Sequence, residues 1–179
     1  EFQQMQIAKK PETTRKQYLD VIGKKTAELF GASCESGVIV ANGSLVEQKA
    51  AYNYGFNLGL AFQIIDDLMD FNAHSKEMGK NLGDDFKLGK TTLPIILAWE
   101  KSNVSEKQFW NKTLKELKQD ANDFEKALTI FHKYNIFEDC RIKAKEFISK
   151  SKISLDQLPN TEFKVHLIGL ANESIQRSK

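Results

Sequence analysis

The feature that most constrains the fold is a long stretch, residues 44–72, that contains no proline. Ser44 and Glu47 form a capping-box pattern at its start, and Asn42-Gly43 precede it as a helix stop. At about 1.5 Å per residue, one helix over this stretch would be more than ~40 Å long. Gly55 and Gly59 lie one turn apart on it, which indicates close approach of a neighbouring helix or of a ligand.

The remaining segments predict the same class of structure. The chain has 179 residues with 3 Pro and 10 Gly, a composition that favours long helices over a many-turned β-sandwich. A capping box at Thr14 and Gln17 begins a helix that should run to about Ala41, and Pro94 marks the first turn of another. Further helices are expected at 105–118, 123–133, 136–151 and 161–177. The sequence therefore predicts an all-α fold.

Charge and hydropathy exclude several classes of function. Lys and Arg number 26 against 24 Asp and Glu, so no overall field calls for nucleic acid as a partner. The apolar runs are far shorter than the roughly 18 residues of a transmembrane segment. Cys34 and Cys140, without a signal-peptide pattern, are interpreted as reduced thiols in a cytoplasmic protein. The chain opens without Met, inside what resembles a helix, and we expect it to be a fragment.

The most informative segment is 62–70, Phe-Gln-Ile-Ile-Asp-Asp-Leu-Met-Asp. On a helix, Asp66 and Asp70 share a face, with Asp67 beside them and Gln63 one turn earlier. Neighbouring carboxylates repel, and a divalent cation would reverse the sign of that interaction. Oxygen ligands without His or Cys favour Mg²⁺. These residues alone leave two interpretations open, a magnesium site and an acidic stripe that faces solvent.

Residues 73–90 follow as a polar loop that contains glycines and lysines. Lysine suits phosphate oxygens as a point charge, and glycine lets the backbone approach a ligand closely. The spacing is neither that of a P-loop nor that of an EF-hand. The loop therefore favours the magnesium interpretation, with a phosphate-bearing ligand.

Two separated motifs resemble a known family. Residues 62–70, followed by Gly79-Lys-x-x-Gly-Asp-Asp-Phe-x-x-Gly-Lys90-x-Thr-Leu-Pro94, are similar to the second aspartate-rich region of trans-isoprenyl diphosphate synthases. Lys25-Thr26, with Ala27, Leu29, Phe30 and Gly37 after it, resembles the Lys-Thr helix of that family. The Gly83-Asp84-Asp85-Phe86 variant is similar to bacterial octaprenyl and decaprenyl diphosphate synthases. The resemblance implies an isoprenoid synthase-type helical bundle, of which residues 1–179 would be the C-terminal portion of a single domain.

The activity that the resemblance implies is a magnesium-dependent prenyl transfer. Isopentenyl diphosphate would be condensed with an allylic diphosphate into a long-chain all-trans polyprenyl diphosphate, a precursor of the ubiquinone side chain. The resemblance also implies a homodimer. It makes Asp66, Asp67 and Asp70 the Mg²⁺ ligands, with Asp66 the chief one.

The other site residues are assigned by the same resemblance. Lys25, Lys80 and Lys90 would hold the allylic diphosphate, and we expect them to share a cavity with Asp66 and Asp70. Thr26 and Gln63 would act with Lys25 in catalysis, because their oxygen dipoles could steady the carbocation. Asp84 and Asp85 are better suited to orienting Lys80 or capping a helix than to binding metal.

The family also has a first aspartate-rich motif followed by a pair of arginines. This chain has neither, and its three arginines, Arg15, Arg141 and Arg177, are isolated. We therefore expect the chain alone to be inactive; the alternative is a non-catalytic helical subunit of a heteromeric synthase. Terpene cyclases are disfavoured because their second metal motif usually mixes Asn, Ser or Thr with Glu. The sequence does not predict the product length.

Overall fold

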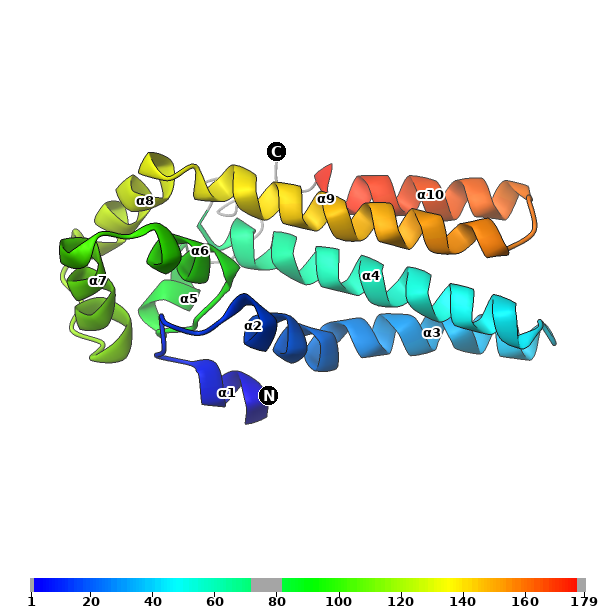
Figure 1. Ribbon diagram of the computed structural model, residues 1–179, viewed down its shortest axis with the longest axis horizontal. Coiled ribbons are helices and arrows are strands. Elements are labelled where there is room, and N and C mark those ends of the chain that lie inside the picture. Colours follow the sequence, from blue (N-terminus) through cyan, green and yellow to red (C-terminus); the bar gives the residue numbers. More distant parts are fainter. Residues whose placement is uncertain (1, 72–81, 177–179) are drawn as a thin grey trace. The chain divides into compact units, whose positions relative to one another are not determined.

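A computed structural model describes residues 2–71 and 82–176 of the chain. Within these ranges every regular element is a helix and none is a strand (Figure 1), which confirms the all-α prediction. Among the residues so described, no helix has the length and apolar character needed to cross a membrane. The chain divides into two compact units, one formed by residues 1–21 and 66–140 and the other by residues 22–65 and 141–179.

The second unit contains most of the long helix expected from the sequence. This helix, α4 (Leu45–Met69), runs beside α3 (Glu28–Val40), and α9 (Ile136–Ser154) runs beside α10 (Glu162–Ser174) (Figure 1). Tyr54 of α4 connects the two pairs. Its hydroxyl donates to the Leu167 carbonyl at 2.8 Å, and its own carbonyl accepts from the Ser151 hydroxyl at 2.9 Å.

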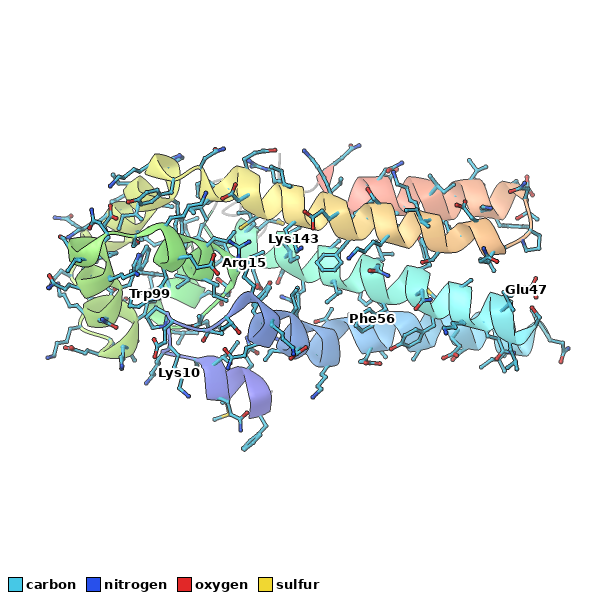
Figure 2. All side chains as sticks on the ribbon, viewed as in Figure 1. Lys10, Arg15, Glu47, Phe56, Trp99 and Lys143 are labelled. Carbon is cyan, nitrogen blue, oxygen red and sulfur yellow. The ribbon has the colours of Figure 1, made fainter. Side chains whose placement is uncertain are left out.

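The two glycines of α4 permit a close helix crossing in this unit. A Cβ atom at Gly59 would lie 2.7 Å from the Ala27 Cα, and one at Gly55 would overlap the Phe30 carbonyl oxygen. Ala27 ends a π-helix, η1 (Gly23–Ala27), that precedes α3. Phe56, labelled in Figure 2, lies over Gly23 on the same side of α4, 3.6 Å from where a Cβ would stand. The packing interpretation of these glycines is therefore correct for the helix–helix contact.

The first unit is built from shorter helices around an aromatic core. They are α1 (Phe2–Ile7), α2 (Arg15–Ile22, to Val21 in this unit), α5 (Asp84–Lys87), α6 (Leu93–Lys101), α7 (Val104–Trp110) and α8 (Asp123–Lys133). Trp110 stacks on Phe131 with ring centroids 5.7 Å apart and meets Phe86 edge-on at 6.5 Å. Arg15, labelled in Figure 2, pairs with Glu100 and so connects α2 to α6.

Local sequence signals placed most helix ends correctly. Both capping boxes are present, because Ser44 and Glu47, and likewise Thr14 and Gln17, exchange hydrogen bonds. Asn42 adopts the left-handed conformation, with φ of 56°, at the end of α3. Two features differ from expectation. The helix expected over 14–41 is interrupted by η1, and that expected over 105–118 ends in a second π-helix, η3 (Asn111–Lys115).

A third difference lies in the loop expected over 73–90. Its described part contains α5, whose Phe86 is buried against Trp110 and Phe124. Residues 72–81, including Gly79-Lys80, lie outside the described part of the chain. Helix α5 was not predicted, because a single helical turn has no periodic pattern and depends on the burial of one aromatic ring, Phe86.

Gly59→Ala should destabilise the purified chain by about 1–3 kcal/mol, because the new methyl group meets backbone atoms that cannot move aside. Gly37→Ala is the matched control, since Gly37 is exposed on α3 and has no atom within 4 Å of its Cβ position. That control should gain up to about 1 kcal/mol from helix propensity. Urea denaturation of both variants measures the difference, and equal midpoints would contradict the close crossing.

Candidate functional site

The carboxyl-terminal end of α4 carries the three predicted metal ligands, all in the first unit. Asp66 and Asp70 are partly exposed, whereas Asp67 is buried, with an exposed fraction of 6%. Asp66 and Asp67 lie on α4, and Asp70 follows its last residue, Met69. The helix therefore orients neighbouring carboxylates differently, with one directed into the protein.

Asp67 is held by a residue from a distant part of the sequence. The Tyr18 hydroxyl, on α2, donates to Asp67 Oδ2 at 2.7 Å. Burial and then the negative charge of Asp67 raise the pKa of Tyr18 well above its ordinary value, so the phenol stays protonated and donates. A buried carboxylate requires such donors, because an ionised group loses its hydration when it leaves water.

Asp70 is organised by the segment around α5. Its carboxylate Oδ2 accepts from the backbone N–H of Asp85 at 3.0 Å, and its carbonyl accepts from the N–H of Gly83 at 2.9 Å. Burial and then the neighbouring charge of Asp85 raise the pKa of Asp70 to about 6. The site therefore concentrates negative charge where solvation is weak.

Lys90 provides positive charge beside Asp70 and Asp85. Its ammonium pairs with the Asp85 carboxylate at 2.5 Å, and that hydrogen bond raises the pKa of Lys90. The preceding Gly89 has φ of 67°, and its carbonyl accepts from the Lys9 N–H at 2.8 Å. Asp85 thus connects a predicted metal ligand, through its backbone, to a predicted diphosphate ligand, through its side chain.

Two of the three predicted catalytic residues, Thr26 and Gln63, meet in the second unit. The Thr26 hydroxyl on η1 donates to Gln63 Oε1 on α4 at 2.8 Å, and both side chains are largely buried. Lys25 precedes Thr26 in the π-helix and is exposed. π-helical turns occur often at functional sites, and this one carries both residues of the Lys-Thr pair. The cavity expected to join Lys25 to Asp66 would involve both units and stays a prediction.

Two other acidic residues have clear local partners. Asp84 lies 3.5 Å from the Lys87 ammonium, and Asp85 pairs with Lys90. The expected orientation of Lys80 by Asp84 or Asp85 stays a prediction, because Lys80 lies outside the described residues; the lysine that Asp85 contacts among the described residues is Lys90. Sequence reasoning did not assign a role to Tyr18. The available signal was a tyrosine among apolar helix positions, where a buried hydroxyl needs an acceptor.

The donor chemistry of this cluster fits a hard divalent cation. All the candidate ligands are carboxylate oxygens. Burial and the charge of Asp85 disfavour the ionised form of Asp70, and the charge of a bound cation would favour it. In residues 2–71 and 82–176, no group of three or more His, Cys, Asp or Glu converges as a metal site. Mg²⁺ is commonly bound through one or two carboxylates together with substrate phosphate.

Comparison with known proteins gives one consistent family. The family model described as polyprenyl synthetase matches residues 1–131. Octaprenyl diphosphate synthase of Haemophilus influenzae is 35% identical over 99% of this chain and 54% of its own length. The enzyme of the same name from Escherichia coli is 36% identical over 100% of this chain and 55% of its own. The chain therefore spans about half the length of these curated relatives.

Solved structures agree with the sequence comparisons. A decaprenyl diphosphate synthase from Rhodobacter capsulatus matches 99% of this chain and 55% of its own, with a TM-score of 0.93 and 35% identity. A polyprenyl synthase from Caulobacter crescentus, complexed with calcium and isoprenyl diphosphate, matches 99% of this chain and 54% of its own, with a TM-score of 0.94 and 32% identity.

Asp70→Asn should remove a pH dependence of the metal-free chain. Because the folded pKa of about 6 lies above the ordinary value of 3.8, the folded state binds more protons between these values. The Asp70 contribution therefore lowers the free energy of unfolding as pH rises from about 4 to 6. The variant should be more stable than wild type at pH 7 in EDTA and show a flatter profile. Urea denaturation at several pH values measures both proteins, and an identical pH dependence of their free energies of unfolding would contradict the raised pKa of Asp70.

Proposed function

Because the chain belongs to the polyprenyl synthetase family, we propose that it contributes to a prenyltransferase that makes a long-chain all-trans polyprenyl diphosphate. Its fold is the isoprenoid synthase-type helical bundle, as the sequence predicted. The proposed substrates are an allylic diphosphate and isopentenyl diphosphate. The observation that carries the proposal is the Asp70–Asp85–Lys90 arrangement, in which two segments of the aspartate-rich motif, residues 62–70 and 79–94, are brought together by hydrogen bonds.

The proposed site residues have two separate roles: some would bind the departing diphosphate, and others would stabilise the allylic cation. Mg²⁺, when bound by Asp66 and Asp70 with Asp67 nearby, would supply positive charge to the departing diphosphate. Lys90, together with Lys25 and Lys80, would hold the diphosphate oxygens. Asp85 holds the Lys90 ammonium in place before the substrate arrives.

The Thr26–Gln63 pair would act on the carbon skeleton. Because the Thr26 hydroxyl donates its proton to Gln63, the lone pairs of the Thr26 oxygen remain available to a nearby positive charge. Loss of diphosphate leaves an allylic cation, the isopentenyl double bond attacks it, and a proton leaves to restore a double bond. The fixed oxygen dipoles of this pair would steady the cation while water is excluded.

Several finer aspects of the proposal rest on the family resemblance. They are Mg²⁺ as the physiological ion, a homodimeric assembly, a cytoplasmic location and use of the product as a quinone side-chain precursor. The calcium and isoprenyl diphosphate named with the Caulobacter crescentus relative support a divalent ion and a prenyl diphosphate ligand in this family.

In the complete protein, Asp66→Ala should lower turnover by about 100-fold or more at saturating Mg²⁺, because a carboxylate ligand is lost. The fold should persist, since the change removes one of several mutually repelling charges. Incorporation of radiolabelled isopentenyl diphosphate into polyprenyl products measures turnover. Asp156→Ala, at an exposed carboxylate outside the site, is the control and should keep wild-type turnover. Near-wild-type turnover of Asp66→Ala would refute its role.

The 179-residue chain assayed by itself should show no measurable chain elongation. Within its sequence there is one aspartate-rich motif of this type and no adjacent pair of arginines. One cluster can bind the ion weakly but cannot fix it in the geometry that the reaction requires. The assay combines the purified chain with labelled isopentenyl diphosphate, an allylic primer and Mg²⁺. Elongated products would show that our account of the mechanism is wrong.

A further inference from the structure

The hydrogen bond between Tyr18 and Asp67 joins the aspartate cluster to a residue that lies outside both sequence motifs. Tyr18 is 2% exposed and Asp67 is 6% exposed, and the two residues are 49 positions apart in the chain. Both belong to the first unit. The contact therefore joins α2 to the end of α4 inside a single compact body.

Because both residues are buried, this hydrogen bond matters to each of them. A buried carboxylate keeps its charge only when donors replace water, and a buried phenol needs an acceptor. Tyr18 Oη and Asp67 Oδ2 satisfy these needs at 2.7 Å, a distance typical of a charge-assisted hydrogen bond. The bond fixes the rotamer of Asp67 and, through it, the last turn of α4 that also presents Asp66.

We propose that Tyr18 is a positioning residue of the aspartate cluster, which orients Asp67 and the adjoining Asp66 for a divalent cation. This inference rests on the proposed function insofar as the cluster binds metal. Tyr18 touches neither the ion nor the substrate in this role. It acts through Asp67, as the outer hydrogen-bond partners of metal-binding carboxylates do in other proteins.

The chain offers a matched control for the competing interpretation, a purely structural hydrogen bond. Tyr54 has the same 2% exposure, and its hydroxyl donates to a backbone carbonyl at 2.8 Å. Its acceptor, Leu167, lies on α10 in the other unit. Tyr54→Phe therefore removes a partly buried phenolic hydrogen bond of similar length without altering a carboxylate.

The test compares Tyr18→Phe, Tyr54→Phe and wild type in the complete protein. Mn²⁺ binding, followed by electron paramagnetic resonance of the free ion, gives a dissociation constant that does not depend on activity. The Mg²⁺ concentration for half-maximal elongation provides a second measure. Thermal unfolding of each variant in EDTA reports the structural cost of the lost hydrogen bond.

We expect Tyr18→Phe to weaken Mn²⁺ binding and raise the half-maximal Mg²⁺ concentration by about 10- to 100-fold. Tyr54→Phe should change both by less than about twofold, although both variants unfold at lower temperature. Equal metal affinity in Tyr18→Phe and wild type would overturn the proposal. So would an equal loss of metal affinity in the two variants.

Asp67→Ala removes both the carboxylate and the acceptor of the Tyr18 hydroxyl, and so supplies a second route if Tyr18→Phe does not fold. Because Tyr18 acts through Asp67, Asp67→Ala should weaken Mn²⁺ binding, and adding Tyr18→Phe should weaken it no further. Unchanged Mn²⁺ binding in Asp67→Ala would count against the proposal. A Tyr18-dependent metal affinity without any chain elongation by wild type would support this inference while refuting the proposed function.

Discussion

Carboxylates withdrawn from water are costly, and two of them, the buried Asp67 and the partly buried Asp70, lie at the end of α4. Each requires compensation, and the first unit supplies it from different directions. Asp67 receives the Tyr18 hydroxyl from α2, and Asp70 receives the Asp85 N–H from the start of α5. Because α2 and α5 are far apart in the chain, these hydrogen bonds also determine which segments come together. The aspartates therefore organise the local fold as well as the proposed site.

The same principle explains the arrangement of positive charge. Lys90 is held in place by several contacts. Asp85 binds its ammonium. The backbone on either side is fixed as well, because the Lys9 N–H donates to the Gly89 carbonyl and the Lys10 N–H donates to the Thr91 hydroxyl. Gln119 adds a hydrogen bond from its side-chain amide to the Phe86 carbonyl at 2.9 Å. In the proposed role of Lys90, a lysine held in this way would lose less conformational freedom on binding phosphate oxygens, so more of the electrostatic attraction would remain as binding energy.

Features of the fold that depend on neighbouring residues were predictable, whereas those that depend on distant ones were not. The capping boxes at Thr14 and Ser44 and the left-handed Asn42 follow from short-range hydrogen bonding and backbone sterics. The π-helical turns, the single turn of α5 and the Tyr18–Asp67 bond arise from tertiary packing. Motif resemblance selected the aspartates, Lys90 and the Thr26–Gln63 pair as candidate site residues, because family-specific spacing carries information that periodicity lacks. It gave no role to Tyr18, since a tyrosine on an apolar face is ordinary until its acceptor is known.

The adjacent Asp66 and Asp67 show why spacing matters as much as residue type in this motif. Successive helix positions are about 100° apart, so a consecutive pair of aspartates cannot direct both carboxylates along one line. In this chain Asp67 turns into the protein, where Tyr18 holds it, and Asp66 remains partly exposed. Inserting one residue before the pair would rotate a different side chain into the position opposite Tyr18 and leave a buried phenol without its acceptor. One aspartate of the pair thus secures the helix, and in the proposed site that hydrogen bond would set the direction in which Asp66 meets a cation.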